Sequence, residues 1–202
     1  MSRVLPILFN MEMVRSILDG RKSCTRRIIK PQPQGYFEVS EEPLYIYDTD
    51  GKQGKITPPY QPGDILYVRE TFIQAAAHIF WYKADDKPWM SKDLLWKPSI
   101  HMPKEAARIW LKVTDVRVER LQDITGLSVQ KEGIELDPKE CASKFDFITE
   151  LFLLFQKLWD STIKKSDLDR YGWDTNPYVW VIEFERCEKP KEEKENDSGD
   201  SK

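Results

Sequence analysis

Short apolar segments separated by turn residues fill the first part of the chain, a pattern typical of strands with few helices. Residues 4–9 predict a strand, in which Pro6 favours an edge or bulge position because proline lacks an amide hydrogen. Residues 11–19 place their apolar side chains on one helical face, and Asn10 is a suitable N-cap for that helix. Residues 25–30 alternate again and predict the next strand.

Later in the chain the clearest strand lies at residues 107–121, where the alternation is interrupted across Thr114-Asp115 and indicates a bulge. Residues 144–160 repeat apolar side chains at helical spacing and predict one long amphipathic helix, either part of the core or a lid packed on the barrel. A shorter helix ends at Gly133, which places Glu132 in its last turn. Further strands are predicted at residues 36–39, 44–47, 65–70, 78–83 and 178–186. The first two are expected to form a hairpin, and Asp50-Gly51 supplies turn chemistry.

This order of elements predicts an α+β fold, built as a small and mainly β barrel with helices at its periphery. A chain of 202 residues suits one domain, which we expect over residues 1–187. Charge, serine and glycine dominate residues 188–202, so this segment is expected to be a disordered charged tail.

Composition narrows the possible functions. The net charge of −3 means that any nucleic-acid surface must be a local patch. The apolar run at residues 145–159 is too short and too polar to span a bilayer, and the amino terminus lacks a signal-peptide pattern, so a cytoplasmic protein is expected. Three widely spaced cysteines argue against a disulfide framework. Zinc-ligand and phosphate-loop spacings are missing, so neither a metal nor a cofactor is expected.

Residues 20–27, with the sequence GRKSCTRR, carry the strongest local chemistry of the chain. Four cations at this spacing repel one another unless an anionic or nucleotide-like group lies nearby. A solvated basic turn is the alternative. In the binding hypothesis, cations at the barrel mouth hold a phosphate or a base edge while an aromatic ring stacks on the base. The predicted binding residues are Arg21, Arg26, Arg27, Tyr67, Arg69, Glu70 and Trp81, with Lys22 beside them.

Several segments in a fixed order resemble the ASCH domain, a β-barrel of the PUA-like superfamily. They are Gly20-x-Lys22-x-x-Thr25-x-Arg27, Pro62-Gly63-Asp64-x-Leu66-x-Val68, residues 121–133 and the closing strand at residues 179–184. With Val68-Arg69-Glu70-Thr71 and the turn at residues 171–174, the chain looks like the longer ASCH proteins of bacteriophages and prophages. The resemblance covers roughly half of the chain. Against its pattern, insertions fall at about 31–60, 71–106 and 135–175.

The resemblance implies two kinds of function. Members of the family are proposed to bind RNA or nucleotides, and a small bacterial ASCH enzyme hydrolyses the acetyl amide of 4-acetylcytidine. By motif, the lysine base of that enzyme falls on Lys22, its threonine nucleophile on Thr25 and its glutamate proton donor on Glu132. The partner predicted for this chain is therefore RNA, single-stranded nucleic acid or a modified nucleoside.

The catalytic interpretation makes a strong demand on Lys22. A threonine hydroxyl needs a neighbouring base, and an unperturbed lysine is neutral in only about one molecule in two or three thousand at pH 7. The neighbouring arginines and burial would favour loss of its proton. An ordinary ion pair between Lys22 and Glu132 is the structural alternative. A metal-dependent ribonuclease is disfavoured, because Asp19 and Glu70 form no recognisable two-metal set.

Overall fold

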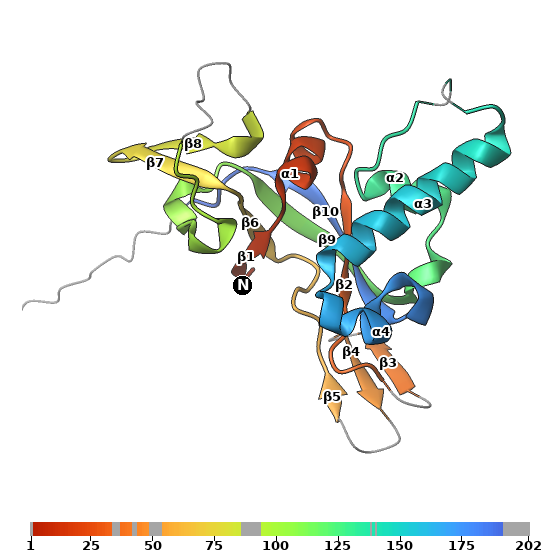
Figure 1. Cartoon of the computed structure of the whole chain (residues 1–202). Coiled ribbons are helices and arrows are strands. Elements are labelled where there is room, and N and C mark those ends of the chain that lie inside the picture. Colours follow the sequence, from red (N-terminus) through yellow and green to blue (C-terminus); the bar gives the residue numbers. More distant parts are fainter. Residues whose placement is uncertain are drawn as a thin grey trace, which may run out of the picture.

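The computed structural model describes residues 2–33, 37–41, 44–48, 54–85, 94–137, 139 and 141–191. A five-stranded sheet lies at its centre (Figure 1). Its strands follow one another in the spatial order β1 (Val4–Leu8), β6 (Ile65–Arg69), β9 (Trp110–Arg120), β10 (Tyr178–Cys187) and β2 (Cys24–Ile28). β1 and β6 are parallel, and the other neighbouring strands are antiparallel. This mixture of sheets and helices confirms the predicted α+β class.

The central sheet has two edges, β1 and β2, so its described strands do not form the closed barrel that was expected. Side chains, rather than a ladder of main-chain hydrogen bonds, connect the two edges. The Arg27 guanidinium donates to the carbonyl oxygen of Leu8 at 3.0 Å and lies 5.5 Å from the ring centroid of Phe9.

The strict alternation of β10 builds a core on each face of the sheet. Trp180 and Ile182 belong to the core that includes α1 (Met11–Leu18), whose cap Asn10 accepts from the Met13 amide at 2.8 Å. Val179 and Val181 belong to the core that includes α3 (Lys144–Thr162). Because successive side chains of a strand point to opposite faces, one apolar strand supports both layers.

The long helix α3 covers the second face, as its apolar stripe predicted (Figure 1). Leu151, Phe155 and Trp159 are buried within this core. The carboxyl end of α3 is held by the following segment, because the Trp159 indole donates to the carbonyl of Tyr171 at 2.9 Å. Asp160 accepts from the amide of Trp173 at 2.8 Å. α3 is therefore a fixed wall of the molecule.

A bulge is present at the predicted interruption, Thr114-Asp115. Glu183 pairs with Asp115, but the next residue of β10, Phe184, pairs with Val113. Thr114 is therefore the extra residue, which bends β9 between its two halves.

The remaining elements lie around this centre. β3 (Phe37–Glu41) and β4 (Leu44–Asp48) form the predicted hairpin, to which β5 (Lys55–Ile56) adds a third strand. β7 (Phe72–Ala76) and β8 (Ile79–Tyr82) form a second hairpin, of which only the second strand was predicted. Two short helices are α2 (Gly126–Lys131) and α4 (Leu168–Tyr171).

The described residues contain no helix of the length and apolarity that crossing a membrane requires. The turn expected at residues 50–51 and most of the expected tail, residues 192–202, lie outside the described residues.

The end of α2 is fixed by a close contact at Gly133. Thr125 caps the start of the helix by accepting from the Ser128 amide, and Gly133 follows its last turn with a φ of +93°. A Cβ atom at Gly133 would lie 2.7 Å from the Cβ of Ser16 and 3.0 Å from the Cβ of Lys22. Only glycine allows the α2 terminus, α1 and the start of β2 to meet this closely.

We expect Gly133→Ala to lower the free energy of unfolding by about 2–4 kcal/mol, because it adds left-handed backbone strain to overpacking. Denaturant unfolding followed by circular dichroism measures this loss. Gly126→Ala is the matched control, since a Cβ at Gly126 meets nothing within 4 Å and alanine favours a helix. Equal stability of the two variants would contradict this account of the junction.

Candidate functional site

Lys22 and Glu132 meet at the junction of β2 and α2, although 110 positions separate them in the sequence. Their main chains form an isolated antiparallel bridge. The Lys22 ammonium donates to the Glu132 carboxylate at 2.8 Å, to the Glu132 carbonyl at 2.9 Å and to the Cys24 carbonyl at 2.8 Å. The Lys22 side chain is 0% exposed, and these three acceptors use all three of its N–H groups.

Arg26 is the second buried cation of the site, with a side chain only 1% exposed. It donates to the second carboxylate oxygen of Glu132 at 3.1 Å and to Glu119 at 3.0 Å. Two buried cations therefore share the one buried carboxylate of Glu132, while Glu119 is 24% exposed. The Nε–H of Arg26 is buried and finds no partner among the described residues.

A chain of ion pairs connects this buried cluster to the surface. Glu119 accepts from Arg117 at 2.7 Å, and Arg117 also donates to Asp115 at 2.7 Å and to Glu183 at 2.9 Å. Burial tends to raise the pKa of Glu183, but hydrogen bonds from Arg117 and Lys131 outweigh it and leave that pKa below its ordinary value. The four cations and four carboxylates of the chain, from Lys22 to Lys131, balance in charge.

Thr25 opens onto the same small cavity as Arg26, Arg27 and Glu132. This cavity has a volume of about 30 Å³ and lies along the edge of β2, beneath α3. Its remaining walls are Met13, Phe155, Leu158, Trp159 and Thr162. Among the described residues, the hydroxyl of Thr25 makes no hydrogen bond, so it is available to a ligand in the cavity.

The main chain of β2 adds polar groups on this side. The amide of Ile29 donates to Tyr178, and the carbonyl of Ser23 accepts from Phe184. In an antiparallel pair these contacts place alternate residues in the ladder with β10, so the N–H and C=O of Arg26 point toward the edge. The edge at Arg26 therefore presents a donor and an acceptor beside its side chain.

Two of the other predicted binding residues lie close to this cluster. Arg27 lines the cavity, while its guanidinium is engaged with Leu8 and Phe9. Arg21 points the other way, because it donates to the Gly133 carbonyl at 2.9 Å and pairs with Asp19 and Glu135.

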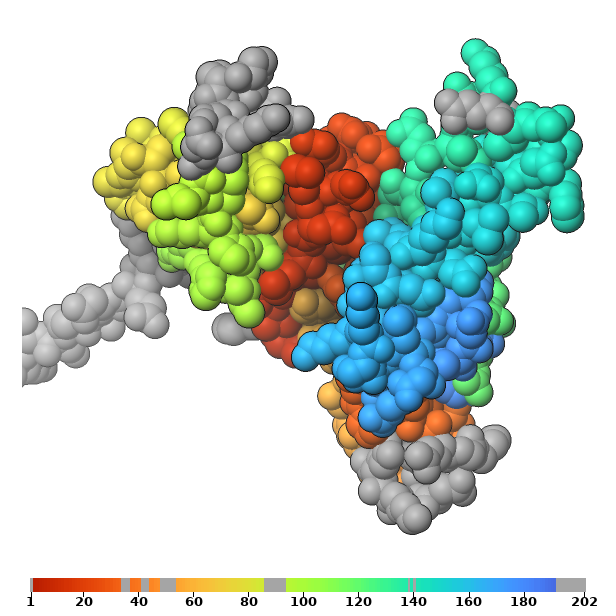
Figure 2. All heavy atoms as spheres, in the orientation of Figure 1, coloured from red at the N-terminus to blue at the C-terminus, as the bar shows by residue number. Residues whose placement is uncertain are grey.

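The structure does not bring Tyr67, Arg69, Glu70 and Trp81 to this cluster. Glu70 is buried and accepts from Arg108 at 2.8 and 3.0 Å; burial raises its pKa even though Arg108 opposes the change. Arg69 donates to the carbonyl of Ile100, Tyr67 packs 6.0 Å from the ring of Trp110, and Trp81 lies in the β7–β8 hairpin. In Figure 2 the red surface of α1 lies between the yellow surface of the β7–β8 hairpin and α3. Their predicted role in binding stays a prediction.

Sequence reasoning did not assign the wall residues Met13, Leu158 and Trp159, or the carboxylate of Glu119. The apolar stripe of α3 was a usable signal for Leu158 and Trp159, since a lid on the barrel was one of its two expected roles. Glu119 gave no signal, because its contact with Arg26 crosses from β9 to β2, which are not neighbours in the sheet.

Neither metal nor thiol chemistry has support here. No group of three or more histidine, cysteine or acidic side chains within the described part of the chain could hold a metal ion. Cys24 lies beside the cluster, but burial raises the pKa of its thiol to about 12, so it stays protonated and unreactive at neutral pH.

Comparisons with known proteins add little. No protein-family model matches the sequence, and no curated protein matches it. A crystal structure of an ASCH domain from Lactobacillus crispatus JV V101 is similar over 91% of this chain and 79% of that chain, with a TM-score of 0.38 and 12% sequence identity. A likeness at this level establishes neither a shared fold nor a shared function.

The shared carboxylate predicts an asymmetry between two variants. Glu132→Gln leaves both Lys22 and Arg26 without their buried anion, so we expect it to lower the free energy of unfolding by about 3–5 kcal/mol. Lys22→Met removes one cation while Glu132 keeps Arg26 as its partner. The free energy of unfolding should therefore fall by about 1–2 kcal/mol less than in Glu132→Gln. Denaturant unfolding at pH 7 measures both values.

Glu135→Gln is the control, because that side chain is 72% exposed and its replacement should change stability by no more than about 0.5 kcal/mol. A Lys22→Met variant that is less stable than Glu132→Gln would show that the carboxylate is not the shared partner.

Proposed function

We propose that this chain is an ASCH domain protein of the PUA-like superfamily, of the phage and prophage type, and that it binds a nucleobase. The base would belong to RNA, to single-stranded nucleic acid or to a modified nucleoside, held between β2 and α3. In this proposal the domain comprises residues 1–187 and includes the three insertions. The protein would act in the cytoplasm. One observation carries it: the neighbouring residues Thr25 and Arg26 converge on one cavity with Glu132, which lies 106 positions beyond Arg26 in the sequence.

The chemistry of this cavity suits a planar heterocycle with donors and acceptors on its edge. Thr25 offers a free hydroxyl, and Arg26 offers its unpartnered Nε–H. Phe155 and Trp159 supply aromatic walls of the kind on which bases stack. An unpartnered buried donor costs about 1–3 kcal/mol, and a ligand acceptor would remove that cost.

The cavity must enlarge before it holds a base. Its volume of about 30 Å³ is far below the roughly 300 Å³ at which pockets for small molecules begin. Two of its wall residues, Met13 and Leu158, have flexible side chains that are only partly buried. The proposal therefore includes a rearrangement of side chains when the ligand binds.

We expect Thr25→Val to weaken binding of 4-acetylcytidine or of a single-stranded RNA oligonucleotide by about three- to tenfold, the value of one neutral hydrogen bond. Titration calorimetry measures the affinity. The fold should be unaffected, because the Thr25 hydroxyl has no hydrogen-bond partner among the described residues.

Thr149→Val is the control, because Thr149 lies on the exposed side of α3. This variant should bind both probes as the unmodified protein does. The proposal fails if the unmodified protein binds neither probe, or if Thr25→Val binds them with unchanged affinity.

A second candidate function is metal-independent hydrolysis of the acetyl amide of 4-acetylcytidine. The observation in its favour is that Thr25 and Glu132 line one cavity while Lys22 contacts Glu132. Thr25 would attack the acetyl carbonyl after losing its proton to Lys22, and Glu132 would protonate the amine that leaves. Water would then release the acetyl group from Thr25. Before the attack, Lys22 would have to pass one proton to Glu132, which makes Lys22 the base and Glu132 the acid; the Lys22 nitrogen now donates to three acceptors.

If the chain is this hydrolase, cytidine should be released from 4-acetylcytidine in the presence of a chelator. Thr25→Ala and Lys22→Met should each slow the release at least about a hundredfold, because each removes a reacting group. Chromatography of the products measures the rate. Turnover that is missing in the unmodified protein, or that is indifferent to both changes, rules out hydrolysis and leaves the binding proposal standing.

A further inference from the structure

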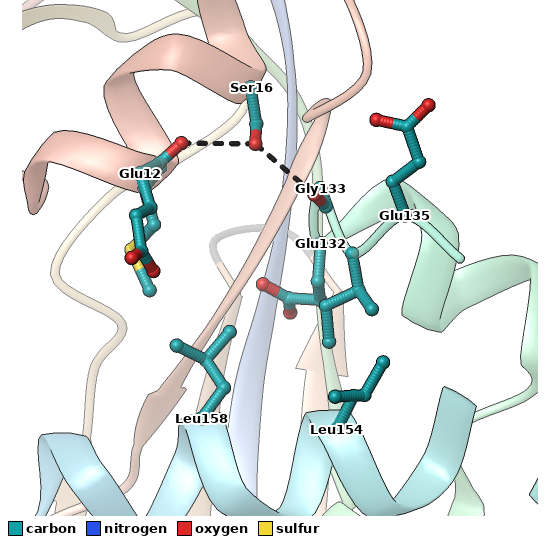
Figure 3. A pocket seen from close by; sticks show the side chains of 9 residues that line it. Glu12, Ser16, Glu132, Gly133, Glu135, Leu154 and Leu158 are labelled. Atoms are coloured by element: carbon teal, nitrogen blue, oxygen red, sulfur yellow. Dashed lines mark hydrogen bonds between the residues drawn. The ribbon is translucent and has the colours of Figure 1, made fainter. Parts of the chain in front are cut away.

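A groove between α1 and α3 lies next to the Thr25 cavity. It has a volume of about 250 Å³, and its polar lining includes Glu12, Ser16 and Glu132. Figure 3 shows Glu132 and two leucines of α3, Leu154 and Leu158, facing the same hollow below Ser16. Of the residues that line this groove, only Glu132 was among the predicted site residues.

The groove and the cavity share three wall residues: Met13, Glu132 and Leu158. Glu132 is held in place by Lys22 and Arg26, so only Met13 from α1 and Leu158 from α3 are free to move between the two spaces. We call this pair the constriction. Together the groove and the cavity approach the lower limit of pockets that hold small molecules, about 300 Å³.

Displacement of the whole helix α3 is a poor alternative route to Thr25. Leu151, Phe155 and Trp159 of this helix are buried in the core, and Trp159 is hydrogen-bonded to Tyr171. Rotation of Met13 and Leu158, by contrast, leaves this core packed.

We infer that the groove is the access route and the outer binding subsite for the ligand of the Thr25 cavity, and that the constriction controls passage between them. The inference rests on the proposed function, because it concerns the same cavity. Glu12 and Glu135 at the groove are hydrogen-bond acceptors that repel phosphate, so the groove suits an uncharged part of the ligand.

The test places a thiol in the cavity and measures how fast a small reagent reaches it. In a Cys24→Ala, Thr25→Cys background, methyl methanethiosulfonate labels the thiol at position 25, and mass spectrometry of the peptide gives the rate. Leu158→Ala should raise this rate at least tenfold because it widens the constriction. Leu154→Ala should change it less than threefold, since Leu154 lines the groove but not the cavity.

Leu154 is a close control because it lies one turn before Leu158 on the same face of α3 and is buried to a similar degree. Met13→Ala widens the constriction from α1 and should also accelerate labelling, which covers the case in which Leu158→Ala does not fold. Unchanged rates in both Leu158→Ala and Met13→Ala would overturn the inference. Equal acceleration by Leu154→Ala would also overturn it, because it would indicate loosening of α3.

This readout needs no ligand, so it separates the two proposals. If Leu158→Ala or Met13→Ala accelerates labelling but the protein binds neither 4-acetylcytidine nor RNA, the proposed function is wrong and the access route stands. If the protein binds them but neither Leu158→Ala nor Met13→Ala changes the labelling rate, only the access route is wrong.

Discussion

The structure depends on one buried electrostatic contact, in which the Glu132 carboxylate is shared between Lys22 and Arg26. Removal of such charges from water costs several kcal/mol for each ion, and good geometry with further hydrogen bonds must offset that cost. Here the ammonium has three acceptors, and both carboxylate oxygens have donors. The contact joins the end of α2 to β2, and Gly133 lets the two segments approach closely enough to make it.

The same contact decides between the two functions. For binding, fixed charges and a free hydroxyl are useful as they stand, because a ligand meets groups that need no reorganisation. For hydrolysis, Lys22 must accept the proton of Thr25, yet all three N–H groups of its ammonium already donate to other acceptors. The geometry therefore supports binding more directly than catalysis. An acyl-transfer step would need the ligand to displace at least one acceptor of Lys22.

Local patterns in the sequence predicted most elements, and long-range order explains what they missed. The alternation of β10 and the apolar stripe of α3 were readable, because each reflects one element lying against one core. The placement of Thr25 and Glu132 on one cavity, with Lys22 bound to Glu132, was expected from resemblance and not from spacing. Tyr67 and Arg69 were expected at the same site, but the order β1-β6-β9-β10-β2 separates β6 from β2 by two strands. No local pattern encodes that order.

The position of α3 over the cavity changes what the site can be. Burial of Leu151, Phe155 and Trp159 is worth about 1.5–3 kcal/mol for each side chain, so lifting the helix would be rare, whereas an off-rotamer side chain costs about 0.5–1.5 kcal/mol. A covered site also has a lower local dielectric, which strengthens the contacts of Glu132 and makes the unpartnered Nε–H of Arg26 costly. The free energy available to a ligand that accepts from Arg26 is therefore greater under α3 than it would be at an open surface.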